Sequence, residues 1–118
     1  MSTLLALRNG LPSSIEPPTP EESLNDARQR MARTFRRDEF VWIINERYDE
    51  HAAAWLIDVL RQGAEGRWMR QRYRYDVPAG VLYFLGESAV DSQTFRLLRR
   101  SSMPFDVPAW QDRSRPPV

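Results

Sequence analysis

The chain has 118 residues and a formal net charge of +1, which fits one globular domain and argues against general polyanion binding. It has no cysteine and a single histidine, His51, so disulfides, thiolate metal sites and multi-histidine metal sites are excluded. All 17 basic residues are arginine, a bias that we attribute to genome composition before selection for phosphate or carboxylate binding. No apolar run has membrane-spanning length, and we expect a soluble, cytoplasmic, bacterial protein.

The first 19 residues are rich in proline and serine, a composition that predicts a disordered tail. Three of its leucines, Leu4, Leu5 and Leu7, belong either to a mobile segment or to a short docking motif. Leu4 to Leu7 is too short for the hydrophobic region of a signal peptide, although the serines are compatible with a bacterial export signal. We therefore expect the folded domain to begin at residue 20.

A helix is predicted to begin at Pro20. Thr19 precedes it as the N-cap, proline takes the first helical position and Glu22 the third, which is the pattern of a capping box. Apolar residues then recur every three or four positions and predict one buried stripe on a helix of about 18 residues: Leu24, Ala27, Met31 and Phe35. The five arginines of residues 28–37 complement the negative end of the helix dipole and require no ligand.

Two apolar segments follow the helix. Residues 40–45 are a nearly continuous apolar run rich in β-branched and aromatic residues, which predicts a strand covered on both faces. Residues 50–62 fit two structures equally well. A helix would be capped by Asp49 and favoured by three successive alanines. A strand would place three alternate apolar residues on one face: Trp55, Ile57 and Val59.

Residues 67–86 have the pattern of a β-hairpin whose turn contains Pro78 and Gly80. In its first strand, aromatic or apolar residues alternate with arginines, so the two kinds of side chain face opposite sides. A three-residue loop would pair Val77 with Val81. That register predicts one core face with six residues: Tyr73, Tyr75, Val77, Val81, Tyr83 and Leu85.

The C-terminal part is predicted to contain a loop and a short helix over residues 88–101, with Asp91 as its N-cap. Two prolines favour an extended chain and a short edge strand over residues 103–110. Residues 111–118 predict a disordered tail. We therefore expect one α+β domain over residues 20–110, with the N-terminal helix packed on a small antiparallel sheet or barrel.

If residues 53–62 form a strand, the order of elements is one helix, four meandering strands, a short helix and a final short strand. This order resembles that of the Sm-like small β-barrel proteins over residues 20–108. The resemblance implies an Sm-like barrel as the alternative to an open sheet. The glycine and Asp/Asn signature of that family's first strands is absent from residues 40–61, so the resemblance implies no RNA-binding residues here.

The first hairpin strand carries the main candidate site, a row of three arginines spaced about 7 Å apart on one face: Arg70, Arg72 and Arg74. Such a row would bind an anion or follow a nucleic-acid backbone, with Trp68 or Phe84 available to stack on a base. The arginines would instead be architectural if the seven carboxylates of residues 38–66 neutralised them. Binding of RNA or DNA is therefore the second functional hypothesis.

Association with a protein partner, or with a second copy of the chain, is the first hypothesis. Four tryptophans are many for so short a chain, and aromatic residues and arginine are enriched in binding hot spots. The candidate interface residues are Phe84 in the hairpin, and Phe105 and Trp110 near the expected edge strand. The alternative interpretation is that these aromatic side chains fill the core.

No catalytic site and no cofactor are expected. His51 has Asp49 and Glu50 close by in the sequence, but adjacent residues do not share one face of a helix. The chain also lacks a glycine-rich phosphate loop, metal-ligand spacing and a nucleophile motif. The sequence therefore predicts a non-catalytic binding or adaptor protein.

Overall fold

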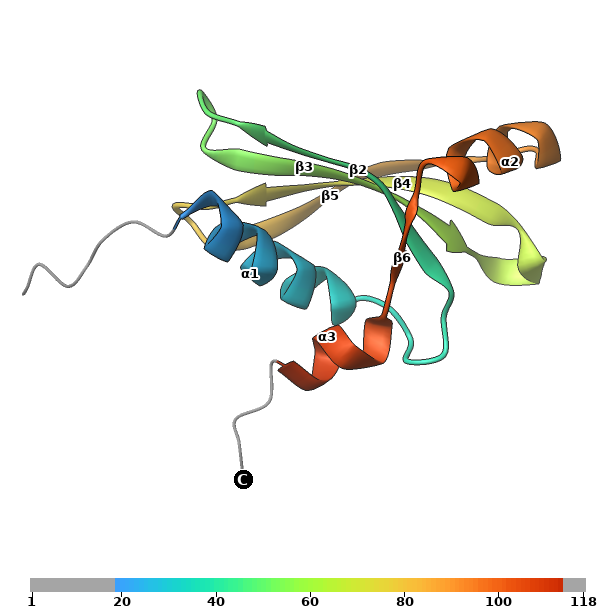
Figure 1. The fold of residues 1–118 in the computed structure, drawn as a ribbon, viewed down its shortest axis with the longest axis horizontal. Helices are drawn as coiled ribbons and strands as arrows, with labels where there is room; N and C mark the ends of the chain where they lie inside the picture. Colours follow the sequence, from blue (N-terminus) through green and yellow to red (C-terminus); the bar gives the residue numbers. More distant parts are fainter. Residues whose placement is uncertain (1–18, 114–118) are drawn as a thin grey trace, which may run out of the picture.

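The computed structural model describes residues 19–113, which form an α+β domain around one five-stranded antiparallel sheet (Figure 1). The strand order across the sheet is β5-β4-β3-β2-β6, and the sheet is open rather than closed into a barrel. In chain order the elements are α1 (Pro20–Ala32), β2 (Val41–Asp49), β3 (Ala54–Gln62), a 3-10 turn (Ala64–Gly66), β4 (Trp68–Asp76), β5 (Val81–Ala89), α2 (Ser92–Arg100), β6 (Met103–Phe105) and α3 (Val107–Arg113). The predicted α+β class is confirmed. Of the two predicted shapes, an antiparallel sheet or a small barrel, the structure has the open sheet.

α1 begins as the sequence predicts. The hydroxyl of Thr19 accepts a hydrogen bond from the N–H of Glu22, and the N–H of Thr19 donates to the Glu22 carboxylate at 2.9 Å, which completes the capping box. The helix ends at Ala32 after 13 residues, well short of the predicted 18. The chain turns there, and Phe35 enters the core from the following loop, where its ring packs edge-to-face on that of Tyr73.

The ambiguous segment 50–62 is a turn followed by β3, so the strand is the correct alternative. The alanines that favoured a helix lie at the turn and the start of the strand, and Ala53 has a positive φ of 50°. β3 is hydrogen-bonded on both sides, to β2 and to β4. Ile57 and Val59 are fully buried on one of its faces, and Leu60 is fully buried on the other. Pairing on two sides and burial on two faces outweigh local helix propensity.

The hairpin of β4 and β5 is present, but its register differs from the prediction by one residue. Its loop has four residues, Val77 to Gly80, and Asp76 pairs with Val81. Gly80 has a φ of 66° and donates its N–H to the carbonyl of Asp76 at 2.8 Å. Proline and glycine thus form the turn as expected, but the left-handed glycine closes a loop that is one residue longer.

The change of register reverses the faces of β5, because successive strand residues point to opposite sides. Tyr73 and Tyr75 are buried, as predicted, but their partners on β5 are Phe84 and Leu82. A bulge in β5 beside Tyr73 shifts the pairing once more. The prediction was therefore wrong for three residues that are exposed instead of buried: Val81, Tyr83 and Leu85.

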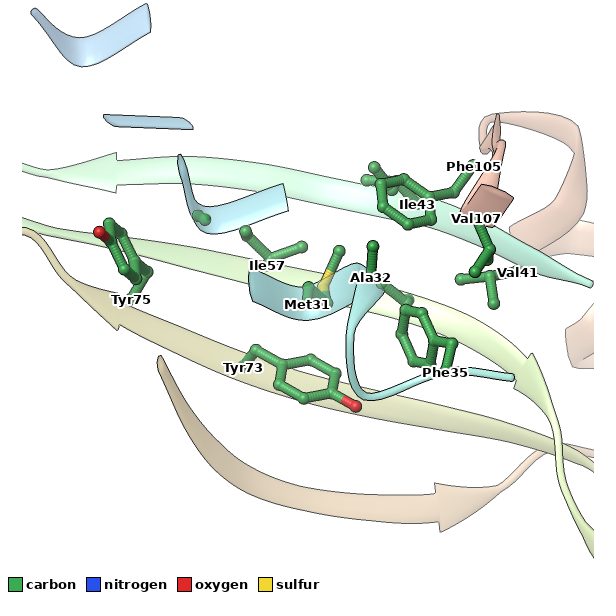
Figure 2. Close-up of a cluster of buried hydrophobic side chains, with 12 residues drawn as sticks. Met31, Ala32, Phe35, Val41, Ile43, Ile57, Tyr73, Tyr75, Phe105 and Val107 are labelled. Atoms are coloured by element: carbon green, nitrogen blue, oxygen red, sulfur yellow. The ribbon is translucent and has the colours of Figure 1, made fainter. Parts of the chain in front are cut away.

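The core lies between α1 and one face of the sheet, which we call the covered face (Figure 2). Met31 projects from α1 towards Ile57 of β3, and Tyr73 and Tyr75 project from the same side of β4. The remaining members come from α1, the following loop, β2, β3, β6 and α3: Ala27, Ala32, Phe35, Val41, Ile43, Val59, Phe105 and Val107. The opposite side of the sheet, which we call the open face, carries the arginines of β4.

α2 packs at one end of the open face. It begins at Asp91, whose carboxylate accepts a hydrogen bond from the N–H of Thr94 at 2.7 Å, as the sequence predicts. The ring of Phe95 lies 4.6 Å from that of Trp68 on β4. In Figure 1, α2 lies at the far end of the sheet from the start of α1. Within residues 19–113, no helix has the length and apolar composition needed to cross a membrane.

α3 corrects the prediction for the C-terminal segment. Residues 103–105 form the expected short strand, β6, but the chain then becomes helical and includes residues 111–113, which were assigned to the tail. Asp106 accepts hydrogen bonds at the start of this helix from the N–H groups of Ala109 and Trp110. Pro108 is compatible with the first turn of a helix, where no N–H partner is required. Of the predicted tails, 1–19 and 111–118, residues 1–18 and 114–118 lie outside the described residues.

Candidate functional site

The three arginines of the predicted row lie along the open face of β4, and a single carboxylate of the neighbouring strand binds two of them. Asp58 on β3 is buried, with 4% of its surface exposed. Its carboxylate accepts hydrogen bonds from Arg72 Nε at 2.8 Å, from Arg72 Nη2 at 3.1 Å and from Arg70 Nη2 at 3.0 Å. Arg70 and Arg72 are therefore partly neutralised within the domain.

The ionisation of Asp58 depends on these contacts. Burial alone would raise the pKa of Asp58, but the hydrogen bonds and positive charges of Arg72 and Arg70 outweigh burial and hold the pKa below its ordinary value. The carboxylate is therefore charged at neutral pH, and it removes one of the two positive charges that the arginines bring to this face. The sequence identifies the acidic segment of residues 38–66 as a competitor for these arginines, but it does not indicate which of the seven carboxylates binds them.

Arg74 differs from the other two arginines. Among the described residues it has no carboxylate partner, and its Nε is buried without a hydrogen-bond partner. Its guanidinium carbon lies 6.0 Å from the ring centre of Tyr83 on β5, within the range of a cation–π contact. Arg74 and the exposed Arg47 on β2 flank Leu56 across the open face. Within residues 19–113, neither of these two arginines has an ion-pair partner.

Trp68 is not available as a free stacking platform. Its ring lies 5.1 Å from that of Trp42 on β2 and 4.6 Å from that of Phe95 on α2. The guanidinium carbon of Arg99 lies 4.6 Å from the ring centre of Trp42 on the same side. Trp68 thus belongs to an aromatic cluster beneath α2, which the sequence did not predict because the three rings come from separate elements.

Of the three predicted interface residues, two are packed within the domain. Phe105 is in the core, and the ring of Trp110 stacks on it with centres 6.0 Å apart. Arg28 and Arg113 lie 5.5 Å and 4.1 Å from the ring centre of Trp110. Phe84, in contrast, is 55% exposed on β5.

The exposed Phe84 belongs to a strand at the edge of the sheet. β5 pairs with β4 on one side, and within residues 19–113 no strand pairs with its outer edge. Three neighbours of Phe84 are also exposed apolar residues: Val81 at 40%, Tyr83 at 46% and Leu85 at 51%. The one charged residue of β5 is Glu87, whose carboxylate accepts a hydrogen bond from Gln71 at 2.8 Å. The outer edge therefore combines unpaired main-chain groups with a run of apolar side chains, which we call the β5 edge (Val81 to Leu85).

A shallow hollow lies beside the β5 edge on the open face. Its lining combines the two paired arginines with residues of β5: Arg70, Arg72, Leu85, Gly86, Glu87 and Ser88. The guanidinium groups that would attract an anion there already bind Asp58. The hollow is therefore a weaker candidate for binding than the β5 edge.

The residues considered for catalysis are dispersed. His51 is exposed in the turn between β2 and β3, where its main-chain N–H donates to the Asp49 carboxylate at 3.0 Å. In the part of the chain that the structure describes, no three His, Asp or Glu side chains gather as metal ligands would. A buried ion pair that the sequence did not identify, Glu39 with Arg61, joins the loop after α1 to the end of β3 at 2.9 Å and has a structural role.

Comparison of the chain with protein-family models, with curated proteins and with solved structures finds no match.

Proposed function

We propose that the protein is a non-catalytic binding module that adds an extended strand of a protein partner to the β5 edge. One observation carries this proposal: β5 is nine residues long, and its outer edge is unpaired among the described residues and lined with exposed apolar side chains. In strand addition, main-chain hydrogen bonds supply affinity and the alternating side chains supply specificity. Val81 and Tyr83 would contact the partner on the open face, and Phe84 on the covered face.

The opposite edge of the sheet is protected in ways that the β5 edge is not. β6 has three residues, one of which is Pro104, and it lies between α2 and α3 in the chain. Proline lacks an N–H, and short edge strands give a partner little to pair with. β5 has no proline, and its single charge lies beyond the apolar run. This asymmetry supports β5 as the edge that binds.

The composition of the β5 edge also supports a binding role. Edge strands of monomeric proteins are usually protected by charged residues, proline, a bulge or a covering element, because an open edge invites aggregation. From Val81 to Phe84, β5 has none of the first three. Contiguous exposed apolar side chains commonly mark an interaction surface. Tyr83 and Phe84 are large aromatic residues of the kind found in binding hot spots. An exposed edge of this kind is consistent with a partner that covers it.

The competing hypothesis, nucleic-acid binding, has less support. Asp58 engages Arg70 and Arg72, Trp68 is packed beneath α2, and the formal net charge of the chain is +1. Counterion release by several free cations provides most of the affinity in nonspecific nucleic-acid binding. Arg74 alone in the predicted row has no carboxylate partner among the described residues.

Capture of partners by the tagged full chain tests the proposal. Tyr83→Lys and Phe84→Lys each place a charge on the β5 edge, and Leu97→Lys is the matched control, because Leu97 is an exposed apolar residue of α2. We expect the two edge variants to lose a specific partner at least about tenfold and the control to retain it. A partner that all three variants retain, or that the control loses equally, would contradict the proposal.

A further inference from the structure

We propose that the strand accepted by the β5 edge is β5 of a second copy of the chain. This inference rests on the proposed function and specifies its partner. The two β5 strands would run antiparallel about a two-fold axis perpendicular to the sheet, and the two sheets would become one continuous sheet. Both copies of α1 would then lie on the same side of that sheet, because such an axis preserves its faces.

The sequence of β5 is self-complementary in one register. With Tyr83 at the two-fold axis, Tyr83 of each copy lies opposite Tyr83 of the other. Leu82 then lies opposite Phe84 of the second copy, and Val81 lies opposite Leu85. Opposite residues in an antiparallel pair project from the same face and contact each other. Every position from 81 to 85 therefore meets an apolar or aromatic side chain, and the bulge of β5 falls at Leu85, the last of these positions.

The same register keeps like charges apart. Arg74 pairs with Tyr83 across the hairpin, so two tyrosines would separate Arg74 of one copy from Arg74 of the other. Three strand spacings correspond to about 14 Å, which exceeds the screening length of about 8 Å at physiological salt. Glu87 would lie opposite Ala79 in the turn of the second copy, outside the apolar run. The pairing buries no charge, and a net charge of +1 gives two copies little mutual repulsion.

The contact would be small. Each copy contributes the five residues of the β5 edge, compared with about 20–30 residues per partner in a standard interface. We therefore expect a reversible dimer with a dissociation constant on the order of 10 µM. A dimer of this strength exchanges between copies in solution, which makes mixing experiments possible.

Sedimentation equilibrium on the full chain tests the inference. Between about 1 µM and about 500 µM, the average mass should rise from the monomer value of 13.9 kDa towards twice that value. Tyr83→Lys places two positive charges opposite each other at the axis and should weaken the dimer at least about tenfold. Leu97→Lys adds the same charge away from β5 and should leave the association unchanged. Far-UV circular dichroism would verify that each variant is folded.

A mixing experiment tests the register. Val81→Lys and Leu85→Asp are both at exposed positions, so neither should prevent folding. Each variant alone should be mainly monomeric, whereas an equimolar mixture should associate, because opposite charges then meet across the axis. A mixture that remains monomeric while the unmodified chain dimerises would contradict this register and therefore the inference.

Different results would contradict the pairing of two copies and the binding of a protein partner. A chain that remains monomeric throughout the concentration range, or a dimer that Leu97→Lys weakens and Tyr83→Lys does not, overturns pairing through β5. If a monomeric chain still captures a different partner in a Tyr83-dependent manner, the binding module stands and the second copy is not its partner. If neither association is found, both proposals are wrong.

Discussion

β4 and β5 are the two strands of one hairpin and have nine residues each, yet their surroundings differ. β4 pairs with strands on both sides, its tyrosines are in the core, and Arg70 and Arg72 bind Asp58. β5 pairs on one side, and most of its apolar side chains are exposed. Both strands carry aromatic side chains, so position in the sheet determines whether such a side chain stabilises the core or is available to a partner.

The largest expected difference concerns two aromatic residues that pair directly, Tyr73 on β4 and Phe84 on β5, whose ring centres are 5.5 Å apart. Tyr73→Ala removes a buried ring and its hydrogen bond to Gln71, and should lower the free energy of unfolding by about 4 kcal/mol. Phe84→Ala should lower it by less than about 1 kcal/mol, because Phe84 is already exposed. Urea unfolding at about 1 µM protein, where we expect monomers, measures both values, and equal losses would contradict the contrast between the strands.

The next effect concerns two carboxylates, Asp58 on β3 and Glu87 on β5. Asp58→Asn leaves Arg70 and Arg72 without their anionic partner and should lower the free energy of unfolding by about 2 kcal/mol, less than for a fully buried pair because both arginines reach solvent. Glu87→Gln on β5 is the matched control, and we expect a change within about 0.5 kcal/mol. If the Glu87 variant loses as much stability, Asp58 does not have the role assigned to it.

Acid should lower the free energy of unfolding through two carboxylates that bind arginines, Asp58 and Glu39. Against the opposing effect of burial, arginine partners hold the pKa values of Asp58 and Glu39 below their ordinary values of 3.8 and 4.5. A lowered pKa stabilises the fold above the ordinary value, and this stabilisation is lost as the pH falls through the folded-state pKa. Urea unfolding between pH 7 and pH 3 should show a decline below about pH 5, which Asp58→Asn should make shallower. An unfolding free energy independent of pH would contradict this assignment.

The smallest expected effect is on nucleic-acid binding. A gel shift with single-stranded RNA or DNA should show no complex at about 150 mM salt, because Asp58 shares two of the three arginines. Any weak shift at low salt should depend more on Arg74 than on Arg72, which alanine variants at each position would reveal. A complex that persists at higher salt, and that the triple alanine variant of Arg70, Arg72 and Arg74 abolishes, would favour nucleic-acid binding over strand addition.

Local signals in the sequence predicted much of the fold. The capping box at Thr19 fixes the start of α1, the alternation of tyrosine and arginine fixes β4, and Asp91 fixes the start of α2. Each of these signals lies within a few consecutive residues, so it can be read without knowledge of the tertiary structure. The early end of α1 and the helix α3 instead depend on tertiary contacts, since Gln111 of α3 donates hydrogen bonds to the last carbonyl group of α1 and to a carbonyl group of the following loop.

The candidate site was predictable only in part. The arginine row lies on one face of β4 as predicted, and Phe84 is exposed, but Phe84 pairs with Tyr73 on the covered face instead of lying on the arginine face. The register of the hairpin decides which face each of these β5 residues takes. One extra residue in the loop moves Tyr83 from the predicted core face to the open face. The partner of Arg70 and Arg72 depends on the register between β3 and β4, which no local pattern specifies.

The contact of Gln111 with the end of α1 has a consequence for how the chain folds during synthesis. The side chain donates hydrogen bonds of 2.9 Å to the carbonyls of Ala32 and Phe35, which lie 79 and 76 positions earlier in the chain. A ribosome therefore completes α1 and all four long strands before this contact becomes possible. Phe105 and Val107 join the core from the same late segment. The nascent domain therefore has an incomplete core until α3 emerges from the ribosome, and this interval is when it is most exposed to misassembly and proteolysis.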